Sequence, residues 1–171
     1  IATGCGFSIL PDATFEEVER TDLLCVPGGL SVAEAVSDAD TLAFVKRQAE
    51  GARWVTSVCT GAFVLGAAGL LRGKRATTHW AYVHLLPLVG ATHEAARVVR
   101  DGNVVTGGGV TAGLDFALAV IGEVAGRAVA ERVQLSIEYD PAPPFAAGSP
   151  EAAPAAREAL AERYGRAAED M

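Results

Sequence analysis

The sequence has few cysteines, no dense run of basic residues and no long apolar run. Its three cysteines are widely spaced and odd in number, which argues against a disulfide framework and against a Cys-x-x-Cys zinc site. No group of His, Cys, Asp and Glu has metal-ligand spacing, so we expect neither a metal nor another cofactor. Free cysteines suit a reducing compartment, and we therefore expect a cytoplasmic protein.

Two further absences limit the partners. The formal net charge is −7 and the Lys and Arg residues do not cluster, so nucleic acids and anionic membranes are poor candidates. The longest apolar stretches, residues 62–71 and 116–124, contain glycine or glutamate. Both are too short to span a bilayer. We expect no nucleic-acid partner and no membrane partner.

The length and composition fit one main domain. The chain has 171 residues, half of them apolar, which is enough to bury a core. We expect this domain over residues 1–150, followed by a C-terminal tail or surface helix over residues 151–171. The chain begins with Ile1 rather than an initiator methionine, which is expected of a fragment or a processed chain.

Short strand patterns alternate with helix patterns along the chain. The expected strands are residues 6–10, 22–26, 53–58, 76–78, 96–100 and 103–106. The expected helices follow Ser31, run from Asp38 to Gly51, and cover residues 60–71, 81–89, 111–124 and 127–138. This alternation, with short turns, indicates an α/β sandwich around a mainly parallel sheet. In such sheets, sites form at the carboxyl ends of the strands.

Cys59 is the strongest candidate for chemistry. It ends an apolar, β-branched run that begins at Trp54, and a small-residue helix pattern starts one residue later. This layout is typical of a strand–nucleophile–helix elbow, with cysteine as the nucleophile. The free N–H groups of the following helix would favour the reactive thiolate. The alternative is a buried cysteine that serves only as a small core residue.

Other candidates also follow expected strands. Gly28 and Gly29 would offer bare N–H groups for an oxyanion-type cradle, or would only form a tight turn. His79 would act as a base or orienting partner of Cys59, or as a hydrogen-bonded histidine at a strand end. Cys25 lies in a Leu/Val run and is expected in the core, whereas Cys5 is uninformative.

Taken together, these motifs strongly resemble the ThiJ/PfpI superfamily, whose domain is similar to class I glutamine amidotransferases. The resemblance covers residues 22–150. It is carried by Pro27-Gly28-Gly29, Ser57-Val58-Cys59-Thr60-Gly61-Ala62-Phe63, Ala76-Thr77-Thr78-His79-Trp80, Arg97–Asn103, Thr106–Phe116 and Glu138-Tyr139-Asp140-Pro141. The last of these motifs, with Gln134-Leu135 and Pro143-Pro144-Phe145, looks particularly like the isocyanide hydratase branch.

The resemblance implies a flavodoxin-like α/β/α sandwich, a homodimer and a cofactor-free lyase that adds water to an isocyanide. Cys59 matches the nucleophile, which would form a thioimidate that water converts to an N-substituted formamide. The amides of Gly29 and Thr60 match the polar cradle of the family. Val110 would neighbour the thiolate, and His79 matches a histidine found near the cysteine in many relatives.

One departure has consequences for activity. Relatives begin with a strand and a helix that carry an acidic residue hydrogen-bonded to the cysteine, and nothing in residues 1–21 matches them. We therefore expect that segment to be missing, with Asp140 as a conceivable second carboxylate. The alternative functions are a ligand- or redox-sensing domain, and glyoxalase-like or protease-like cysteine chemistry.

Overall fold

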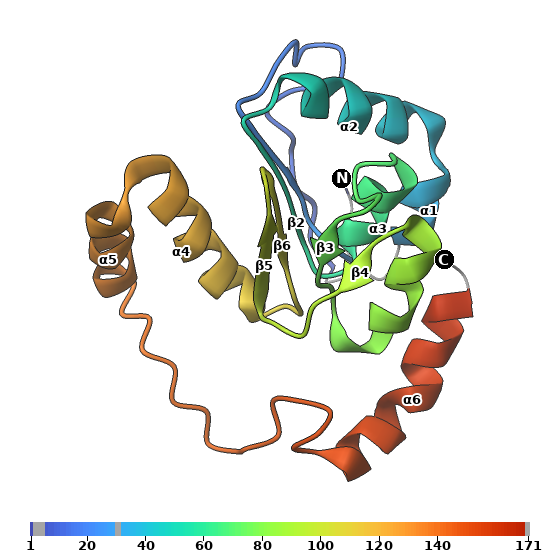
Figure 1. Cartoon of the computed structure of the whole chain (residues 1–171), viewed down its shortest axis with the longest axis vertical. Helices are drawn as coiled ribbons and strands as arrows, with labels where there is room; N and C mark the ends of the chain where they lie inside the picture. Colours follow the sequence, from blue (N-terminus) through green and yellow to red (C-terminus); the bar gives the residue numbers. More distant parts are fainter. Residues whose placement is uncertain (2–5, 30–31, 170–171) are drawn as a thin grey trace.

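The computed structural model describes residues 1, 6–29 and 32–169. Its centre is a four-stranded sheet in the order β1-β2-β6-β5 (Figure 1). These strands are β1 (Leu23–Val26), β2 (Trp54–Val58), β5 (Val98–Asp101) and β6 (Val104–Gly107). β1, β2 and β6 are parallel, and β5 runs antiparallel to β6. A separate parallel pair consists of β3 (Arg75–Ala76) and β4 (Thr92–His93).

Helices cover both faces of the central sheet. They are α1 (Val32–Ser37), α2 (Ala39–Gly51), α3 (Gly61–Ala67), the 3₁₀ helix η1 (Trp80–Val89), α4 (Ala112–Ala125), α5 (Arg127–Ser136) and α6 (Pro154–Glu169). On one face, Leu24, Val55 and Val104 share a core with α1, α2 and α3. On the other face, Trp54 and Val105 pack against α4. The predicted α/β/α sandwich with a mainly parallel sheet is confirmed.

The burial of the central strands explains their sequences. β2 and β6 lie between two helical layers, so apolar residues are needed on both sides of each strand, and every residue of β6 is buried. β1 is an edge strand, and its burial alternates. Cys25 is exposed, so its expected place in the core is wrong. It is paired with Thr56 on the α4 side, where α4 packs on β2, β5 and β6.

Other expected elements differ in extent. The expected strand over residues 6–10 is wrong: Ile9 exchanges backbone hydrogen bonds with Ile1 at 2.7 and 2.8 Å, outside the central sheet. The helix after Cys59 ends at Ala67 rather than at residue 71 because Gly69 turns the chain with φ of 79°. Ser31, the expected start signal of α1, and Cys5 lie outside the described residues.

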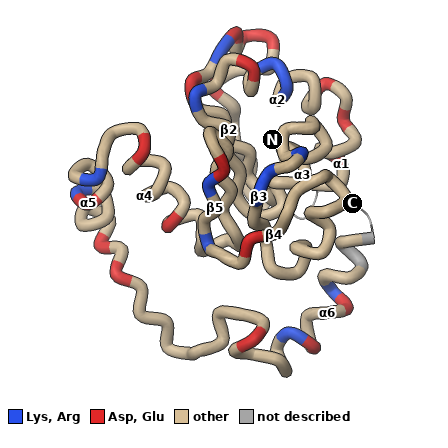
Figure 2. The backbone as a smooth tube through the Cα atoms, in the orientation of Figure 1, with Lys and Arg blue, Asp and Glu red and all other residues tan. Residues whose placement is uncertain are grey.

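The C-terminal third first leaves the sandwich and then returns to it. α4 and α5 form an antiparallel arm on one side of the sheet, and the segment after α5 leads to α6 beside η1 (Figure 1). Tyr164 and Ala168 of α6 pack against the core shared by α1, α2 and α3. Basic and acidic residues are mixed along α2 and α6 (Figure 2). No described helix is both long enough and apolar enough to cross a membrane.

Candidate active site

Cys59 occupies a strained turn between β2 and α3. Its φ of 57° lies in the left-handed region, which costs a residue with a Cβ about 1–2 kcal/mol. The surrounding backbone holds this conformation. The Cys59 N–H donates to the carbonyl oxygens of Gly107 and Gly108 at 3.0 and 2.8 Å, and the Thr78 hydroxyl donates to the Cys59 carbonyl at 2.7 Å. The side chain is partly exposed, so the expected elbow is present.

The turn after β1 packs closely against the Cys59 turn. A Cβ on Gly28 would lie 2.7 Å from the Thr60 nitrogen and 2.8 Å from the Cys59 Cβ, so only glycine fits there. The neighbouring Gly29 N–H donates to the Thr60 hydroxyl at 3.0 Å, and this hydroxyl donates to the Gly29 carbonyl at 2.9 Å. The structure thus brings Gly28, Gly29, Cys59 and Thr60 together, as their positions after parallel strands predict.

The protonation of Cys59 differs from the expectation. Burial raises the pKa of the Cys59 thiol above its ordinary value, and this effect exceeds the lowering by hydrogen bonds from the Thr60 N–H and side chain. α3 has only seven residues, and Thr60, which precedes it, makes no side-chain capping hydrogen bond. The expected shift of the pKa in favour of the thiolate is therefore wrong. At neutral pH the protonated thiol predominates.

His79 packs against the glycine turn that follows β6. A Cβ on Gly109 would lie 3.1 Å from the His79 Cδ2, so the ring is packed closely against this turn. Its Nδ1 accepts a hydrogen bond from the Ala81 N–H at 3.3 Å and caps η1. Burial lowers the pKa of His79, so the ring is neutral at pH 7. Among the described residues, no hydrogen bond joins His79 to Cys59.

Two tyrosines beside this site were missed by the sequence reasoning. Tyr82 is only 3% exposed, and its ring lies 6.5 Å from that of Phe63, in the elbow helix. Burial raises the pKa of Tyr82, with smaller contributions from Tyr164 and Cys59. Tyr82 follows His79 by three residues, which is one turn of a 3₁₀ helix. The spacing of His79 and Tyr82 can be read from the sequence. Nothing in the sequence around Tyr164, in contrast, predicts that α6 brings this residue next to the site.

Two further candidate residues, Val110 and Asp140, are exposed. Val110 is 81% exposed in the turn before α4, and Asp140 is exposed in the segment after α5. Tyr139, next to Asp140, instead donates to Asp115 of α4 at 3.1 Å. Among the described residues, no cluster of three or more His, Cys, Asp or Glu side chains could hold a metal ion.

The sequence and the structure were compared with known proteins. The chain is 56% identical over 156 residues to an isonitrile hydratase of Pseudomonas putida, covering 91% of this chain and 68% of the relative. It is 31% identical over 131 residues to the Parkinson disease protein 7 homolog of Danio rerio, covering 74% of this chain and 69% of that protein. The crystal structure of a ThiJ/PfpI family protein from Pseudomonas syringae superposes with a TM-score of 0.93 at 45% identity. That match covers 97% of this chain and 70% of the other. The DJ-1/PfpI family profile matches residues 1–123, and the chain belongs to this family.

Proposed function

We propose that this protein is an isocyanide hydratase-like lyase that uses Cys59 as its nucleophile. The observation that carries the proposal is the partly exposed cysteine at a left-handed turn, φ 57°, after a buried parallel strand. A turn that stores strain and is held by several backbone hydrogen bonds is typical of functional sites. The relative named isonitrile hydratase, at 56% identity, supports the choice of substrate.

The reaction would proceed in two stages. The Cys59 sulfur supplies an electron pair for a bond to the terminal carbon of R–N≡C, and the lone pair of that carbon takes up a proton. This gives a thioimidate, Cys–S–CH=N–R. Water then adds to the C=N carbon, with a proton going to nitrogen, and the C–S bond breaks to release R–NH–CHO and the cysteine. The sum is one isocyanide plus one water to one formamide, which requires no cofactor.

The environment of Cys59 suits this chemistry. Because burial raises the pKa of Cys59, the thiol at neutral pH still carries the proton that the isocyanide carbon has to receive. The Thr60 N–H would supply a polar group beside the reacting carbon, and Gly29 would act through its hydrogen bonds with the Thr60 hydroxyl, which hold this residue in place. His79, neutral and hydrogen-bonded to Ala81, would shape the site rather than act as the base.

Turnover of an isocyanide tests the proposal. Purified protein is given phenyl isocyanide, and the formamide is measured for wild type, Cys59→Ser and Cys25→Ser. We expect turnover by wild type and by Cys25→Ser, since Cys25 is exposed on the edge strand, and none by Cys59→Ser. Turnover that survives in Cys59→Ser would refute the nucleophile. A folded wild type without turnover would leave two explanations, a sensing domain or the lack of the acidic segment found in relatives, and adding that segment would separate them.

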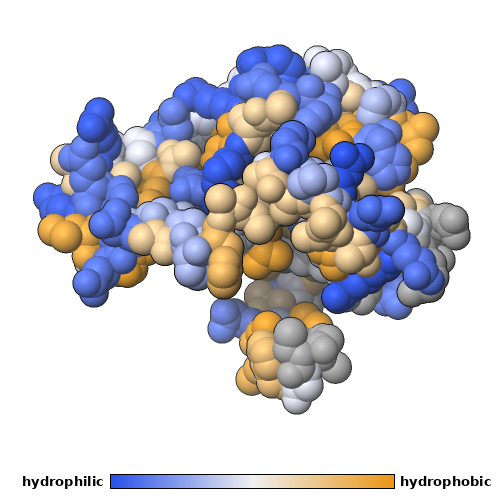
Figure 3. Space-filling view, turned by 90° about the horizontal axis from the view of Figure 1, so that it is seen from below, coloured by the Kyte–Doolittle hydropathy of each residue, from blue (hydrophilic) through white to orange (hydrophobic). Residues whose placement is uncertain are grey.

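We also propose that the α4–α5 arm forms the interface of a homodimer. Val110 and Leu135 are each 81% exposed, and Leu114 and Ile137 are 45% and 52% exposed. Figure 3 shows hydrophobic residues among hydrophilic ones at the surface on the side of α5. A dimer would bury these side chains. Light scattering should give twice the chain mass for wild type and a monomer for Leu135→Lys.

A further inference from the structure

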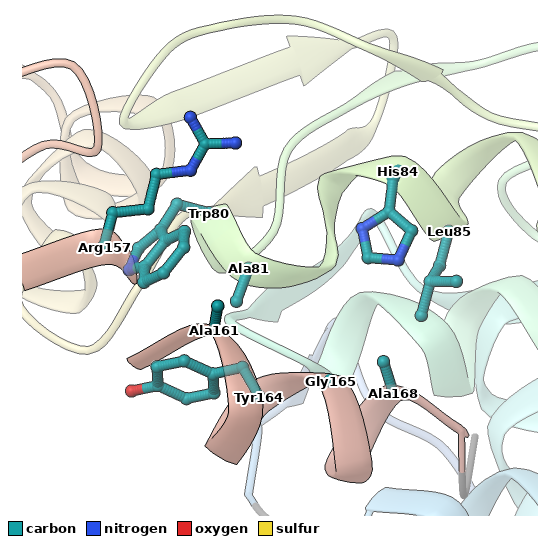
Figure 4. A pocket seen from close by; sticks show the side chains of 9 residues that line it. All are labelled: Trp80, Ala81, His84, Leu85, Arg157, Ala161, Tyr164, Gly165 and Ala168. Carbon is teal, nitrogen blue, oxygen red and sulfur yellow. The ribbon is translucent and has the colours of Figure 1, made fainter. Parts of the chain in front are cut away.

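The C-terminal third of the chain approaches the candidate site in two places. α6 brings the Tyr164 ring to 5.0 Å from the His79 ring and 5.4 Å from the Trp80 ring, between centroids (Figure 4). The segment after α5 brings Tyr139 to α4, where its hydroxyl donates to the Asp115 carboxylate at 3.1 Å. The contact made by α6 is a packing of rings, whereas the contact made by Tyr139 is the first of a series of hydrogen bonds.

The Asp115 carboxylate joins Tyr139 to Arg97, the residue before β5. Its Oδ1 accepts from the Tyr139 hydroxyl, and its Oδ2 accepts from the Arg97 Nε at 2.6 Å. The Arg97 Nη2 also donates to the hydroxyl of Thr111, directly before α4, at 3.3 Å. Hydrogen bonds between ionised groups are about twice as strong as neutral ones, so these contacts fix the arginine against α4. We call Arg97, Asp115 and Tyr139 the Arg97 network.

The Arg97 backbone continues the series to the nucleophile. Its carbonyl accepts from the Gly108 N–H at 2.9 Å, and the Gly108 carbonyl accepts from the Cys59 N–H at 2.8 Å. Gly108 is buried, so its polar groups depend on these protein partners. The bond to the Cys59 N–H is one of those that hold Cys59 at φ of 57°. One series of hydrogen bonds therefore runs from Tyr139 to the strained turn.

We propose that the Arg97 network positions the nucleophile: it fixes the Arg97 carbonyl, which holds the glycine turn against the Cys59 N–H. The proposal rests on the proposed function and adds positioning residues to it. It also gives a role to residues from three separate motifs, at 97–103, 106–116 and 138–141. Because the network acts through the backbone of Cys59, loosening it displaces the sulfur and lowers kcat, while KM is unchanged.

A second ion pair beside the network provides a matched control. Arg100 of β5 pairs with Glu123 of α4, and their side chains are 50% and 40% exposed, against 56% and 32% for Arg97 and Asp115. The Arg100 carbonyl accepts from the Arg75 side chain, whereas the Arg97 carbonyl accepts from the glycine turn. Asp115→Asn and Glu123→Gln thus make the same chemical change, and only Asp115→Asn acts on the Cys59 turn.

The kinetic test measures kcat and KM for phenyl isocyanide, with circular dichroism confirming that each variant is folded. Asp115→Asn should lower kcat about two- to fivefold at an unchanged KM, the fold-change that corresponds to a partly exposed ion pair. Glu123→Gln should change neither constant. Adding Tyr139→Phe to Asp115→Asn should lower kcat no further, because both changes act through one carboxylate. Equal kcat values for Asp115→Asn and Glu123→Gln, or an effect on KM alone, would overturn the proposal.

Alkylation of Cys59 separates this proposal from the proposed function, because it requires no turnover. Peptide mass spectrometry follows iodoacetamide labelling of Cys59, with the exposed Cys25 as internal reference. Cys59 is only partly exposed, so loosening its turn in Asp115→Asn should accelerate its labelling about two- to fivefold, and Glu123→Gln should not. If wild type hydrates no isocyanide but this difference is found, the hydratase assignment fails and the network stands. Equal labelling rates of Cys59 in wild type and Asp115→Asn would contradict the network, whatever the activity.

Discussion

The strain at Cys59 can be measured by replacing the residue with alanine and with glycine. Alanine keeps a Cβ at φ 57° and retains the cost of about 1–2 kcal/mol for a left-handed residue. Glycine removes that cost but loses about 0.5–1 kcal/mol of stability through the greater freedom of the unfolded chain. Taking the middle of each range, we expect Cys59→Gly to be more stable than Cys59→Ala by about 0.75 kcal/mol.

Urea denaturation is the assay, because a change in midpoint at constant slope reports stability alone. With a slope of about 2 kcal/mol/M, the glycine variant should unfold roughly 0.4 M later than the alanine variant. Ala62→Gly is the matched control three residues away: Ala62 is buried in α3, and there the same exchange should cost about 1 kcal/mol. If Cys59→Gly is no more stable than Cys59→Ala, the native turn stores no strain and the account of the elbow is wrong.

Four further predictions concern the site and its surroundings. Gly28→Ala places a methyl carbon 2.8 Å from the Cys59 Cβ and should lower kcat/KM at least tenfold, whereas Gly148→Ala, with nothing within 4 Å, should not. Because burial raises the pKa of Cys59, its alkylation by iodoacetamide should accelerate about tenfold per pH unit up to at least pH 8.5; a plateau near pH 7 would contradict the raised pKa. Burial lowers the pKa of His79, so its stabilising contribution is present above about pH 6.5 and is lost as the pH falls through the lowered value; His79→Gln should weaken this acid dependence of the urea midpoint. Glu138 has φ of 50°, and Glu138→Gly should raise the free energy of unfolding by about 0.5–1 kcal/mol, a gain that calorimetry would detect.

Local patterns predicted the part of the fold that positions the nucleophile. The run from Trp54 to Val58 is apolar and β-branched because both faces of β2 are covered, and the small residues after Cys59 allow α3 to pack closely. Gly61 shows this directly, because a Cβ there would collide with the Val26 carbonyl oxygen. The strands expected over residues 96–100 and 103–106 correspond to β5 and β6, and Asp101-Gly102 between them is typical of a hairpin turn, with Gly102 at φ of 66°.

The errors arose where tertiary arrangement decides the outcome. An apolar run such as Leu23–Val26 does not reveal whether its strand is central or at the edge, so the exposure of Cys25 was not foreseen. The pKa of Cys59 depends on how much protein surrounds the sulfur, which a helix-start argument does not include. Tyr164 reaches the His79 ring across more than eighty residues of sequence, and only the docking of α6 on η1 creates that contact.

The central claim, that Cys59 attacks the isocyanide carbon, is tested most directly by trapping the intermediate. Wild-type protein is mixed with excess phenyl isocyanide, quenched within milliseconds and digested for mass spectrometry. The account predicts that the peptide containing Cys59 gains the mass of one isocyanide, that this adduct decays as formamide appears, and that the peptide containing Cys25 is unmodified. Formamide production without any adduct on Cys59, or an adduct that never decays, would contradict it.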